Sequence, residues 1–342
     1  MTDRQHAGAH AAAPAPKPWI RLLAAYREPS PARSLFEVAV TFLPFAGLWA
    51  LAWTAIHLGY WEASLLPSLL AAGLLLRLFM IQHDCGHGAF FRRRGVNDWV
   101  GRAIGVLTLT PYDAWRRAHA VHHASSGNLE RRGVGDIDTL TIGEYRCLGF
   151  WGRLRYRTYR HPLVMFGLGP VYLFVLRHRW PPVGAGGRRD WFSAMATNLA
   201  VAGLAGGLIW LVGVGPFLLV QLPITLAAGA AGIWLFFVQH QFEDTYWAAG
   251  GTWCPQDAAL RGSSHYHLPG VLRWLTANIG IHHVHHLASR IPFYRLPRVL
   301  RDHPELAATS RLTLRQSLGC VRLTLWDETQ KRLVSFREAR DK

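Results

Sequence analysis

Long, nearly uncharged runs of apolar residues dominate the hydrophobic pattern of this 342-residue chain. Four of these runs have the roughly 18–25 residues that a helix needs to cross a bilayer. Very short polar or glycine-containing turns, at residues 59–62 and 213–215, separate the members of each pair. The pattern therefore predicts two membrane-spanning hairpins. Their helices are expected at about residues 35–58, 63–81, 191–212 and 216–238.

Two further apolar runs, at residues 99–110 and 162–176, are shorter. Their lengths suit interfacial or re-entrant helices rather than spans. If only one of them crossed the membrane, the two hairpins would present their connecting segments on opposite faces. We therefore expect both runs to remain on one side.

The distribution of positive charge supports this topology. Half of the residues are hydrophobic, yet the formal net charge is +16. Lys and Arg number 5 in residues 1–33, 17 in 84–190 and 14 in 239–342, while the two predicted outer turns have none. Positive residues accumulate on the cytosolic side of membrane proteins, so both termini and the middle segment are expected there. The long uncharged runs argue against a nucleic-acid partner.

The expected fold class is therefore an all-α integral membrane bundle of four transmembrane helices, with interfacial helices and a cytosolic helical cap. Residues 1–33 are Ala- and Pro-rich near their start and are expected to form a cytosolic N-terminal segment, with about the first 18 as a mobile tail. A membrane domain is predicted at 34–310, followed by a cytosolic C-terminal segment at 311–342.

Histidines recur in three short stretches next to the predicted spans. The spacing is His-x-x-x-His at 83–87 and His-x-x-His-His at 119–123 and 282–286. Residues three and four apart share one face of a helix, so the histidines of each stretch can converge. Imidazole binds Zn, Cu, Fe and Ni, and eight nitrogens exceed the needs of one ion. We therefore predict a centre with more than one metal. The ligands are His83, His87, His119, His122, His123, His282, His285 and His286.

Three residues beside these stretches are further candidates. His240 lies where the fourth span meets the cytosol, and its place next to the other histidines favours a ligand over a helix cap. Asn278 precedes His282 by one helical turn, so it is placed to reach the metal directly or through water. His283 would start a second register of the third stretch, but the helical spacing favours His282.

Carboxylates are expected around the metal, because a ligating imidazole usually donates its second N–H to one. Gly133 and Gly135 permit a tight turn that would direct Asp136 or Asp138 inward. The alternative for each carboxylate is a surface salt bridge with one of the many arginines. The candidates are Asp84, Asp113, Asp136, Asp138, Glu243 and Asp244.

Other features of the sequence limit which reactions such a metal site is expected to catalyse. The four cysteines are far apart in sequence and do not match an iron–sulfur site, and hydrolytic zinc sites use only three protein ligands. Two irons held by neutral imidazoles can reductively split O2 and take hydrogen from an unactivated C–H bond. The chain has no Gly-rich dinucleotide fingerprint after a strand, so the electrons would come from a separate protein.

The three histidine stretches resemble the boxes of the membrane fatty acid desaturases, in particular the bacterial acyl-lipid type. Matching flanks are Gly-Ala-Phe-Phe at 88–91, Ser-Gly-Asn-Leu at 126–129, Gln-His-Gln-Phe-Glu at 239–243 and Arg-Ile-Pro-Phe-Tyr at 290–294. The similarity covers roughly residues 35–305.

This resemblance implies a di-iron centre held by nine histidines, with His240 in the ninth place. It also implies O2 as co-substrate, a fatty acyl lipid as substrate, and two electrons from a ferredoxin or a cytochrome b5-like protein. The expected location is the bacterial inner membrane, with the active site facing the cytosol. The basic cytosolic face could dock an acidic carrier by complementary charge. Alternatively, positive-inside bias alone accounts for most of the arginines.

Two other functions share some of these features. A di-iron hydroxylase or ketolase of alkanes, sterols or carotenoids uses similar boxes and the same oxidant. A membrane carrier of metal or haem would also need histidines, but it should place them within the spans or on both faces. The prediction that all the histidines lie on one face argues against a carrier, whereas desaturation and hydroxylation differ in how the substrate is placed.

Overall fold

Two long helical hairpins form the frame of the molecule. The computed structural model describes residues 19–180 and 187–341, and four helices in this part are long and apolar enough to cross a membrane. The four predicted spans are therefore confirmed, while the expected mobile tail at residues 1–18 lies outside the described residues. The helices are α2 (Pro31–His57), α3 (Leu65–His87), α8 (Gly187–Val212) and α9 (Val214–His240).

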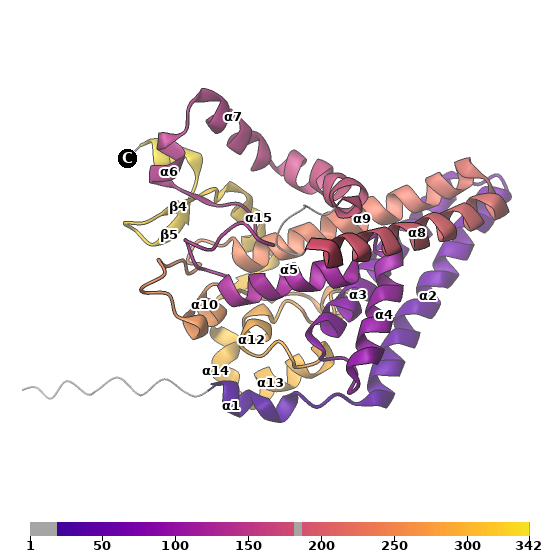
Figure 1. Cartoon of the computed structure of the whole chain (residues 1–342), viewed down its shortest axis with the longest axis horizontal. Helices are drawn as coiled ribbons and strands as arrows, with labels where there is room; N and C mark the ends of the chain where they lie inside the picture. The colour runs from indigo at the N-terminus through magenta and orange to yellow at the C-terminus, as the bar shows by residue number, and fades with distance from the viewer. Residues whose placement is uncertain (1–18, 181–186, 342) are drawn as a thin grey trace, which may run out of the picture.

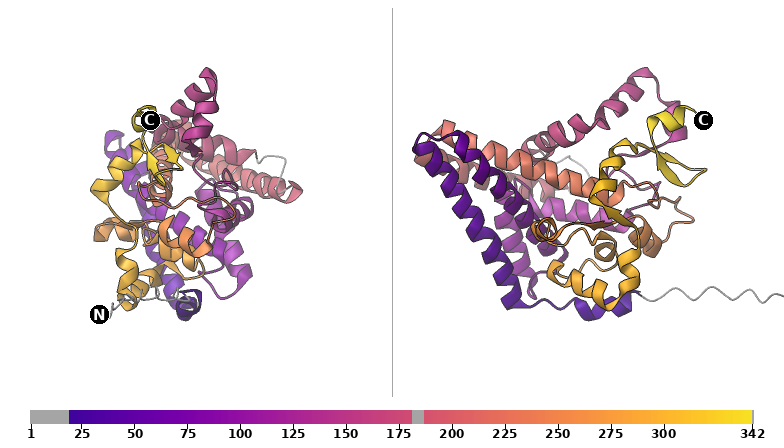
Figure 2. Two further views of the ribbon diagram at one scale, coloured as in Figure 1. Left: turned by 90° about the vertical axis from the view of Figure 1, so that its left-hand side faces the viewer. Right: turned by 180° about the vertical axis from the view of Figure 1, so that it is seen from behind.

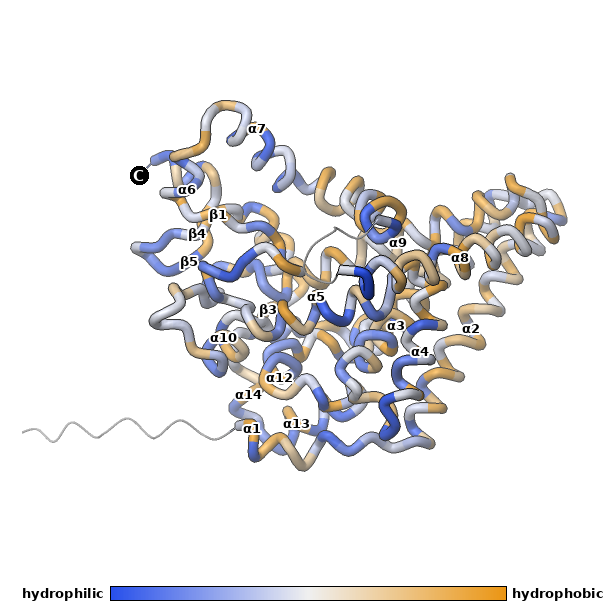
Figure 3. The backbone as a smooth tube through the Cα atoms, in the orientation of Figure 1, coloured by the Kyte–Doolittle hydropathy of each residue, from blue (hydrophilic) through white to orange (hydrophobic). Residues whose placement is uncertain are grey.

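The hairpins meet at their turns, at the right of Figure 1, and diverge toward a mixed region at the left. A short turn, η2 (Glu62–Ser64), joins α2 to α3, and Gly213 joins α8 to α9. Figure 3 shows apolar residues along the hairpins, while hydrophilic residues gather in the left-hand part. No residue in the most apolar window of α8 is buried within the protein. Such an exposed apolar surface marks contact with lipid.

Helix α3 is the most buried of the four long helices. An ion pair between Arg77 of α3 and Glu37 of α2 joins the first hairpin, and both side chains are only 2% exposed. Arg77 also donates from Nε to Thr41 Oγ1 at 3.1 Å. A buried charge must be paired and hydrogen-bonded to be tolerated, so these contacts fix the two helices about two turns before the first histidine stretch.

Short helices connect the two hairpins on the side away from their turns. The two shorter apolar runs fall on α4 and on η3 with η4, and none of these helices is among the four long apolar ones. Phe166 in η3 packs against Trp234 and Phe237 of α9. The connecting elements are α4 (Arg94–Leu107), α5 (Tyr112–Ser125), α6 (Ile142–Cys147), α7 (Phe150–Tyr159), η3 (Leu163–Leu168), η4 (Val171–Leu176) and η5 (Arg177–Arg179).

The cap after α9 is built from short helices and small sheets (Figure 2). Its helices are α10 (Pro255–Arg261), α11 (Gly270–Leu275), α12 (His282–Leu287), η6 (Phe293–Arg295), α13 (Leu296–Asp302), α14 (Pro304–Ala308), α15 (Leu314–Gly319), η7 (Cys320–Arg322) and α16 (Phe336–Arg340). Its strands, with one from the middle segment, are β1 (Leu140–Thr141), β2 (His265–His267), β3 (Arg311–Thr313), β4 (Leu325–Asp327) and β5 (Arg332–Val334).

Residues of both terminal segments contact other parts of the chain. Strand β3 pairs in parallel with β2, and β4 pairs with both β1 and β5, so residues after 310 complete sheets begun earlier in the chain. At the other end, α1 (Trp19–Leu22) and η1 (Leu23–Tyr26) pack on the cap. The Tyr26 hydroxyl donates to Asp302 at 2.8 Å. The parts of the two segments that the structure describes are therefore folded onto the rest.

Candidate metal centre

Nine histidines form two adjacent clusters, within each of which the ligand nitrogens lie within 4.8 Å of one another. We call them the five-histidine cluster and the four-histidine cluster. The rings of His123 and His286, one from each cluster, stack at 4.1 Å between centroids, so the clusters share a wall. The five-histidine cluster contains His83, His87, His119, His123 and His285. The four-histidine cluster contains His122, His240, His282 and His286.

The helical spacing suggested that the histidines of each His-x-x-His-His stretch converge on one point. In the structure, each stretch is instead divided between the two clusters. Helix α5 gives His119 and His123 to one cluster and His122 to the other. Helix α12 reverses this division, because His282 and His286 join the four-histidine cluster and His285 joins the other. Residues four apart remain together, while the middle histidine, about 60° from the first and about 100° from the last around the helix, points to the second cluster.

Both clusters lie at the ends of α3 and α9 that are farthest from the hairpin turns. Helix α3 ends at His87 because Gly88 adopts a left-handed conformation (φ 65°). His240 is the last residue of α9. The two helices run in the same direction from their turns, so the first histidine stretch and His240 are brought to one side of the bundle.

The third stretch is held by the cap. Tyr266 N donates to Gly280 O at 2.7 Å, and a Cβ on Gly280 would lie 2.4 Å from Tyr266 O. Ala277 and Asn278 both have positive φ (48° and 56°), a conformation that costs energy in residues with a side chain. Only glycine therefore fits at position 280. The tight loop that results places α12 beside the clusters.

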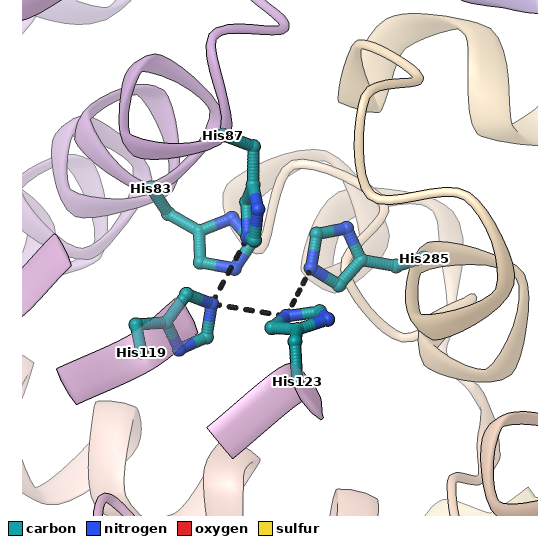
Figure 4. Close-up of side chains that lie close together, drawn as sticks. All are labelled: His83, His87, His119, His123 and His285. Atoms are coloured by element: carbon teal, nitrogen blue, oxygen red, sulfur yellow. Dashed lines mark hydrogen bonds between the residues drawn. The ribbon is translucent and has the colours of Figure 1, made fainter. Parts of the chain in front are cut away.

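In the five-histidine cluster the rings converge from three helices (Figure 4). His119 Nε2 lies 3.0 Å from His87 Nε2 and 3.1 Å from His123 Nε2, which in turn lies 3.1 Å from His285 Nε2. The Nδ1 atoms of His83 and His285 are buried and have no hydrogen-bond partner among the described residues. The Nε2 atoms therefore share the centre of this cluster.

In the four-histidine cluster two rings have defined partners for their outer nitrogens. His122 Nδ1 contacts Asp136 Oδ1, and His240 Nδ1 lies 3.0 Å from Gly262 O. A carbonyl oxygen only accepts, so His240 is protonated on Nδ1 and presents the Nε2 lone pair to the cluster. His240 Nε2 lies 3.2 Å from His122 Nε2 and 3.1 Å from His282 Nε2.

Burial favours the neutral form of five cluster imidazoles on α5 and α12. Burial is the largest cause that lowers the pKa of His119, His123, His282, His285 and His286 well below the ordinary value of 6.5, and the neighbouring imidazoles lower it further. A neutral imidazole has a free lone pair for a metal. Several inward-facing lone pairs about 3 Å apart would repel one another, so a cation at each centre would relieve this conflict.

The spacing of the nitrogens also fits a metal ion. Metal–imidazole bonds are about 2.1 Å long, and two such bonds at a right angle place their nitrogens about 3.0 Å apart. The contacts in the two clusters are 3.0–3.2 Å. The two histidine clusters are thus compatible with metal sites, each with donors at the separation of adjacent ligands.

Among the predicted carboxylates, Asp136 and Asp84 lie next to cluster histidines. Asp136 contacts His122 after a turn in which Gly133 and Gly135 have positive φ (99° and 71°). Asp84 Oδ1 is 3.5 Å from His83 Nδ1, and Asp84 Oδ2 accepts from Phe293 N at 2.7 Å.

The other predicted polar residues have different partners. Asp113 pairs with Arg102, and Glu243 is exposed and pairs with Arg332. Exposed residues also include Asp138 and Asp244. Asp113 and Glu243 therefore form the salt bridges with arginine that were the alternative interpretation, whereas Asp138 and Asp244 are exposed without one being found among the described residues.

Asn278 and His283 are likewise tied to the backbone. Asn278 Nδ2 donates to Phe293 O at 3.2 Å, which fixes the loop before α12. His283 Nε2 lies 2.8 Å from Leu306 O, and burial lowers the pKa of His283 to about 3. The structure thus places His282, and not His283, in a cluster.

Two contacts of the clusters were not foreseen from the sequence. The Trp115 ring stacks on His119 with centroids 4.8 Å apart and an interplanar angle of 14°. Trp115 precedes His119 by four residues, so helical spacing could have identified it. Gly262 O gave no such signal, because a backbone carbonyl has no sequence signature and the residue is distant in the chain from His240.

The fold and the clusters together define a membrane protein with two histidine clusters, compatible with a metal site, at one end of its helical bundle. The model of the fatty acid desaturase family matches residues 61–317. A protein of Bacillus subtilis named "Fatty acid desaturase" is 44% identical over 315 residues, which cover 92% of this chain and 89% of that protein. The chain therefore belongs to the fatty acid desaturase family, and it is an oxidoreductase of lipid metabolism.

More distant relatives have more specific names. The "sn-1 acyl-lipid omega-3 desaturase (ferredoxin)" of Synechocystis is 28% identical over 292 residues, covering 79% of this chain and 75% of that protein. The "sn-1 oleoyl-lipid 12-desaturase" of Anabaena variabilis is 26% identical over 272 residues, covering 70% and 71%. These names favour desaturation over the hydroxylase or ketolase alternative.

Proposed function

We propose that this protein is an acyl-lipid desaturase that holds two iron ions, one in each histidine cluster, and uses O2 to introduce a double bond into a fatty acyl chain. The observation that carries the proposal is the pair of clusters with nine convergent imidazoles. Five and four nitrogen donors are more than the three protein ligands of a catalytic zinc site. A pair of iron ions bound there would supply the oxidising power to remove hydrogen from an unactivated C–H bond.

The electron balance requires a donor. Reduction of O2 to two water molecules takes four electrons, and loss of two hydrogen atoms from the acyl chain supplies two of them. The other two must come from a separate carrier. We infer a ferredoxin, because a relative that aligns over most of this chain is named as ferredoxin-dependent. A cytochrome b5-like protein is the alternative donor.

The protein's own residues would orient the ligands and exclude water. Asp136 would hold the His122 ring and the Gly262 carbonyl would hold the His240 ring, each with Nε2 directed at the four-histidine cluster. Burial of His282, His285 and Val284 on α12 keeps solvent from both centres. With positive residues on the side of the clusters, we infer that the active site faces the cytosol, in the inner membrane of a bacterium.

Expression in a bacterial host that lacks desaturases, followed by mass spectrometry of its lipids, tests the proposed reaction. Loss of two hydrogens from an acyl chain is the expected product change, and a His122→Ala chain is the matched control. Gain of one oxygen without loss of hydrogen would instead identify a hydroxylase. Purified enzyme supplied with either reduced ferredoxin or reduced cytochrome b5 then distinguishes the donors.

A further inference from the structure

A basic groove lies between α6, α7 and α16, in the upper left of Figure 1 and away from the histidine clusters. Its cavity has a volume of about 430 Å³. The lining has no carboxylate and combines four arginines with apolar and aromatic side chains. The arginines are Arg146, Arg153, Arg157 and Arg340.

Three of these arginines are positioned by neutral acceptors. Arg146 donates to Ala339 O at 3.0 Å, and Arg157 donates from Nε to the Tyr145 hydroxyl at 2.6 Å. Arg153 donates to two backbone carbonyls, at 2.9 and 2.8 Å. Within the described part of the chain, none of the three lies within 4.0 Å of a carboxylate oxygen. Their charges are therefore held in place without being neutralised.

Arg340 differs from the other three, because its Nε lies 3.7 Å from Asp341 Oδ1. Both of these side chains are largely exposed, at 78% and 62%. An exposed pair of this kind is weak and readily exchanged. The groove as a whole therefore keeps an excess of positive charge.

The location of the groove relates it to the membrane. Helix α7 leads directly into the apolar segment of η3 and η4, which packs on α9: Gly229 of α9 approaches Pro170 and Phe174 so closely that a Cβ would lie 2.9 Å from Pro170. On the outer side of this segment, Leu163 and Leu168 are 76% and 65% exposed. These side chains therefore face lipid, since α9 is itself one of the candidate spans.

The first residues of α7 continue this surface. Phe150 and Trp151 are 73% and 76% exposed, and aromatic residues concentrate where a membrane meets water. Phe150 also lines the groove, where the guanidinium groups of Arg153 and Arg157 lie over the rings of Tyr145 and Phe336. Arginine matches the geometry of phosphate and binds it through paired N–H groups.

We propose that this groove binds the phosphate headgroup of an anionic phospholipid, with Phe150 and Trp151 inserted at the interface beside it. Inorganic phosphate shares the recognising charge but has no apolar part. The apolar lining and the lipid-facing segment that follows α7 favour the lipid. This binding is independent of the proposed reaction, because no cluster histidine lines the groove.

Binding of a fluorescent phosphatidylglycerol to the full chain in detergent, competed with unlabelled phosphatidylglycerol or phosphatidylcholine, tests the proposal. Phosphatidylglycerol should compete much better than phosphatidylcholine. Each basic side chain contributes about fivefold near an anionic surface, so Arg153→Gln with Arg157→Gln should weaken binding roughly 25-fold. The matched control is Arg298→Gln with Arg301→Gln on α13, which removes the same charge outside the groove and should change binding less than about twofold.

A single substitution outside α7 tests the proposal even if the double variant in α7 does not fold correctly. Arg340→Gln alters only an exposed side chain near the C-terminus and should weaken binding about fivefold. Unchanged affinity in both groove variants, or an equal loss in the α13 control, would overturn the proposal. Equally strong competition by inorganic phosphate would show a small-anion site instead. If lipid binding were unchanged while the KM for reduced ferredoxin rose, the groove would be a docking surface for the acidic carrier, and the lipid proposal would be wrong.

Discussion

The two histidine clusters achieve a similar geometry by different means. The five-histidine cluster has one more donor, yet His285 Nδ1 has no hydrogen-bond partner among the described residues, and His83 Nδ1 has only Asp84 Oδ1 nearby, at 3.5 Å. The four-histidine cluster has fewer donors, but Asp136 and Gly262 O fix two of its rings. Orienting partners tune both ring direction and basicity. Because His282 Nδ1 of the four-histidine cluster also has no hydrogen-bond partner among the described residues, the two clusters differ in how many rings are anchored by close contacts.

A small cavity lies beside one of the two clusters. A cavity of about 10 Å³ adjoins the four-histidine cluster, lined among others by Asp136, Phe236 and His240. This is room for about one water molecule. The cavity lies on the side of Asp136 and Gly262, which contact the outer Nδ1 atoms of His122 and His240, so it is behind these rings rather than among the Nε2 atoms. The following changes test this difference, in order of decreasing effect.

Removal of a ligand should have the largest effect. His285→Ala and His286→Ala alter adjacent residues of α12 that belong to different clusters. Each should lower desaturation more than about 100-fold. Loss of one imidazole leaves the ligand set of a buried metal site incomplete, so the site binds its metal less tightly. Each should also lower the iron content of the purified protein, measured by elemental mass spectrometry, while the amount inserted in membranes stays unchanged.

These two variants also test the division into clusters. If one cluster loses its iron first, the remaining iron should have a different Mössbauer spectrum in the two variants, since different sites survive. Identical spectra at identical iron content would contradict two separate centres. Wild-type activity in either variant would show that the histidine is not a ligand.

Loss of an orienting carboxylate should have a smaller effect that is confined to one cluster. Asp136→Asn removes the charge beside His122 while keeping the size of the side chain. Changes of this kind cost about 10–100-fold in metal affinity or activity. We expect about one iron per chain to become easily removed by a chelator. Asp138→Asn, at an exposed neighbour, is the control and should retain both irons; an equal loss there would assign the effect to the loop.

The pH dependence of the metal-free protein should be moderate. In the folded chain, burial lowers the pKa of His119, His123, His282, His285 and His286 well below 6.5, while unfolded imidazoles titrate near about 6.5. Below that pH the unfolded chain binds more protons than the folded chain, so stability decreases as the pH falls. The thermal midpoint should be constant above about pH 7 and lower at pH 5.5. A His285→Ala chain should show a smaller decrease, and an unchanged midpoint in the wild type at pH 5.5 would contradict the lowered pKa values.

The smallest effect is expected outside both clusters. His267 is exposed at the end of β2 and belongs to neither cluster. His267→Ala should change desaturation less than about twofold and leave the iron content unchanged. A complete loss of activity would show that the two clusters do not contain every important histidine.

The hydrophobic pattern alone was sufficient to locate the four long helices. Helix α9, for example, was expected at 216–238 and extends over Val214–His240. A span needs a minimum number of consecutive apolar residues whatever its neighbours are, so this information is local. The same holds for the histidine spacing, which identified eight of the nine residues that come together, while His240 was expected from its place at the end of the fourth span.

Only the tertiary structure decided how those nine histidines are divided. Helical periodicity separates His122 from His119 and His123 by direction, but it does not say that a second centre lies in that direction. That centre exists because α9 brings His240 and α12 brings His282 and His286 to the same point. The same reason explains Gly262 O and the paired strands after residue 310: their partners are distant in sequence, and contacts between distant segments have no local pattern from which they could be predicted.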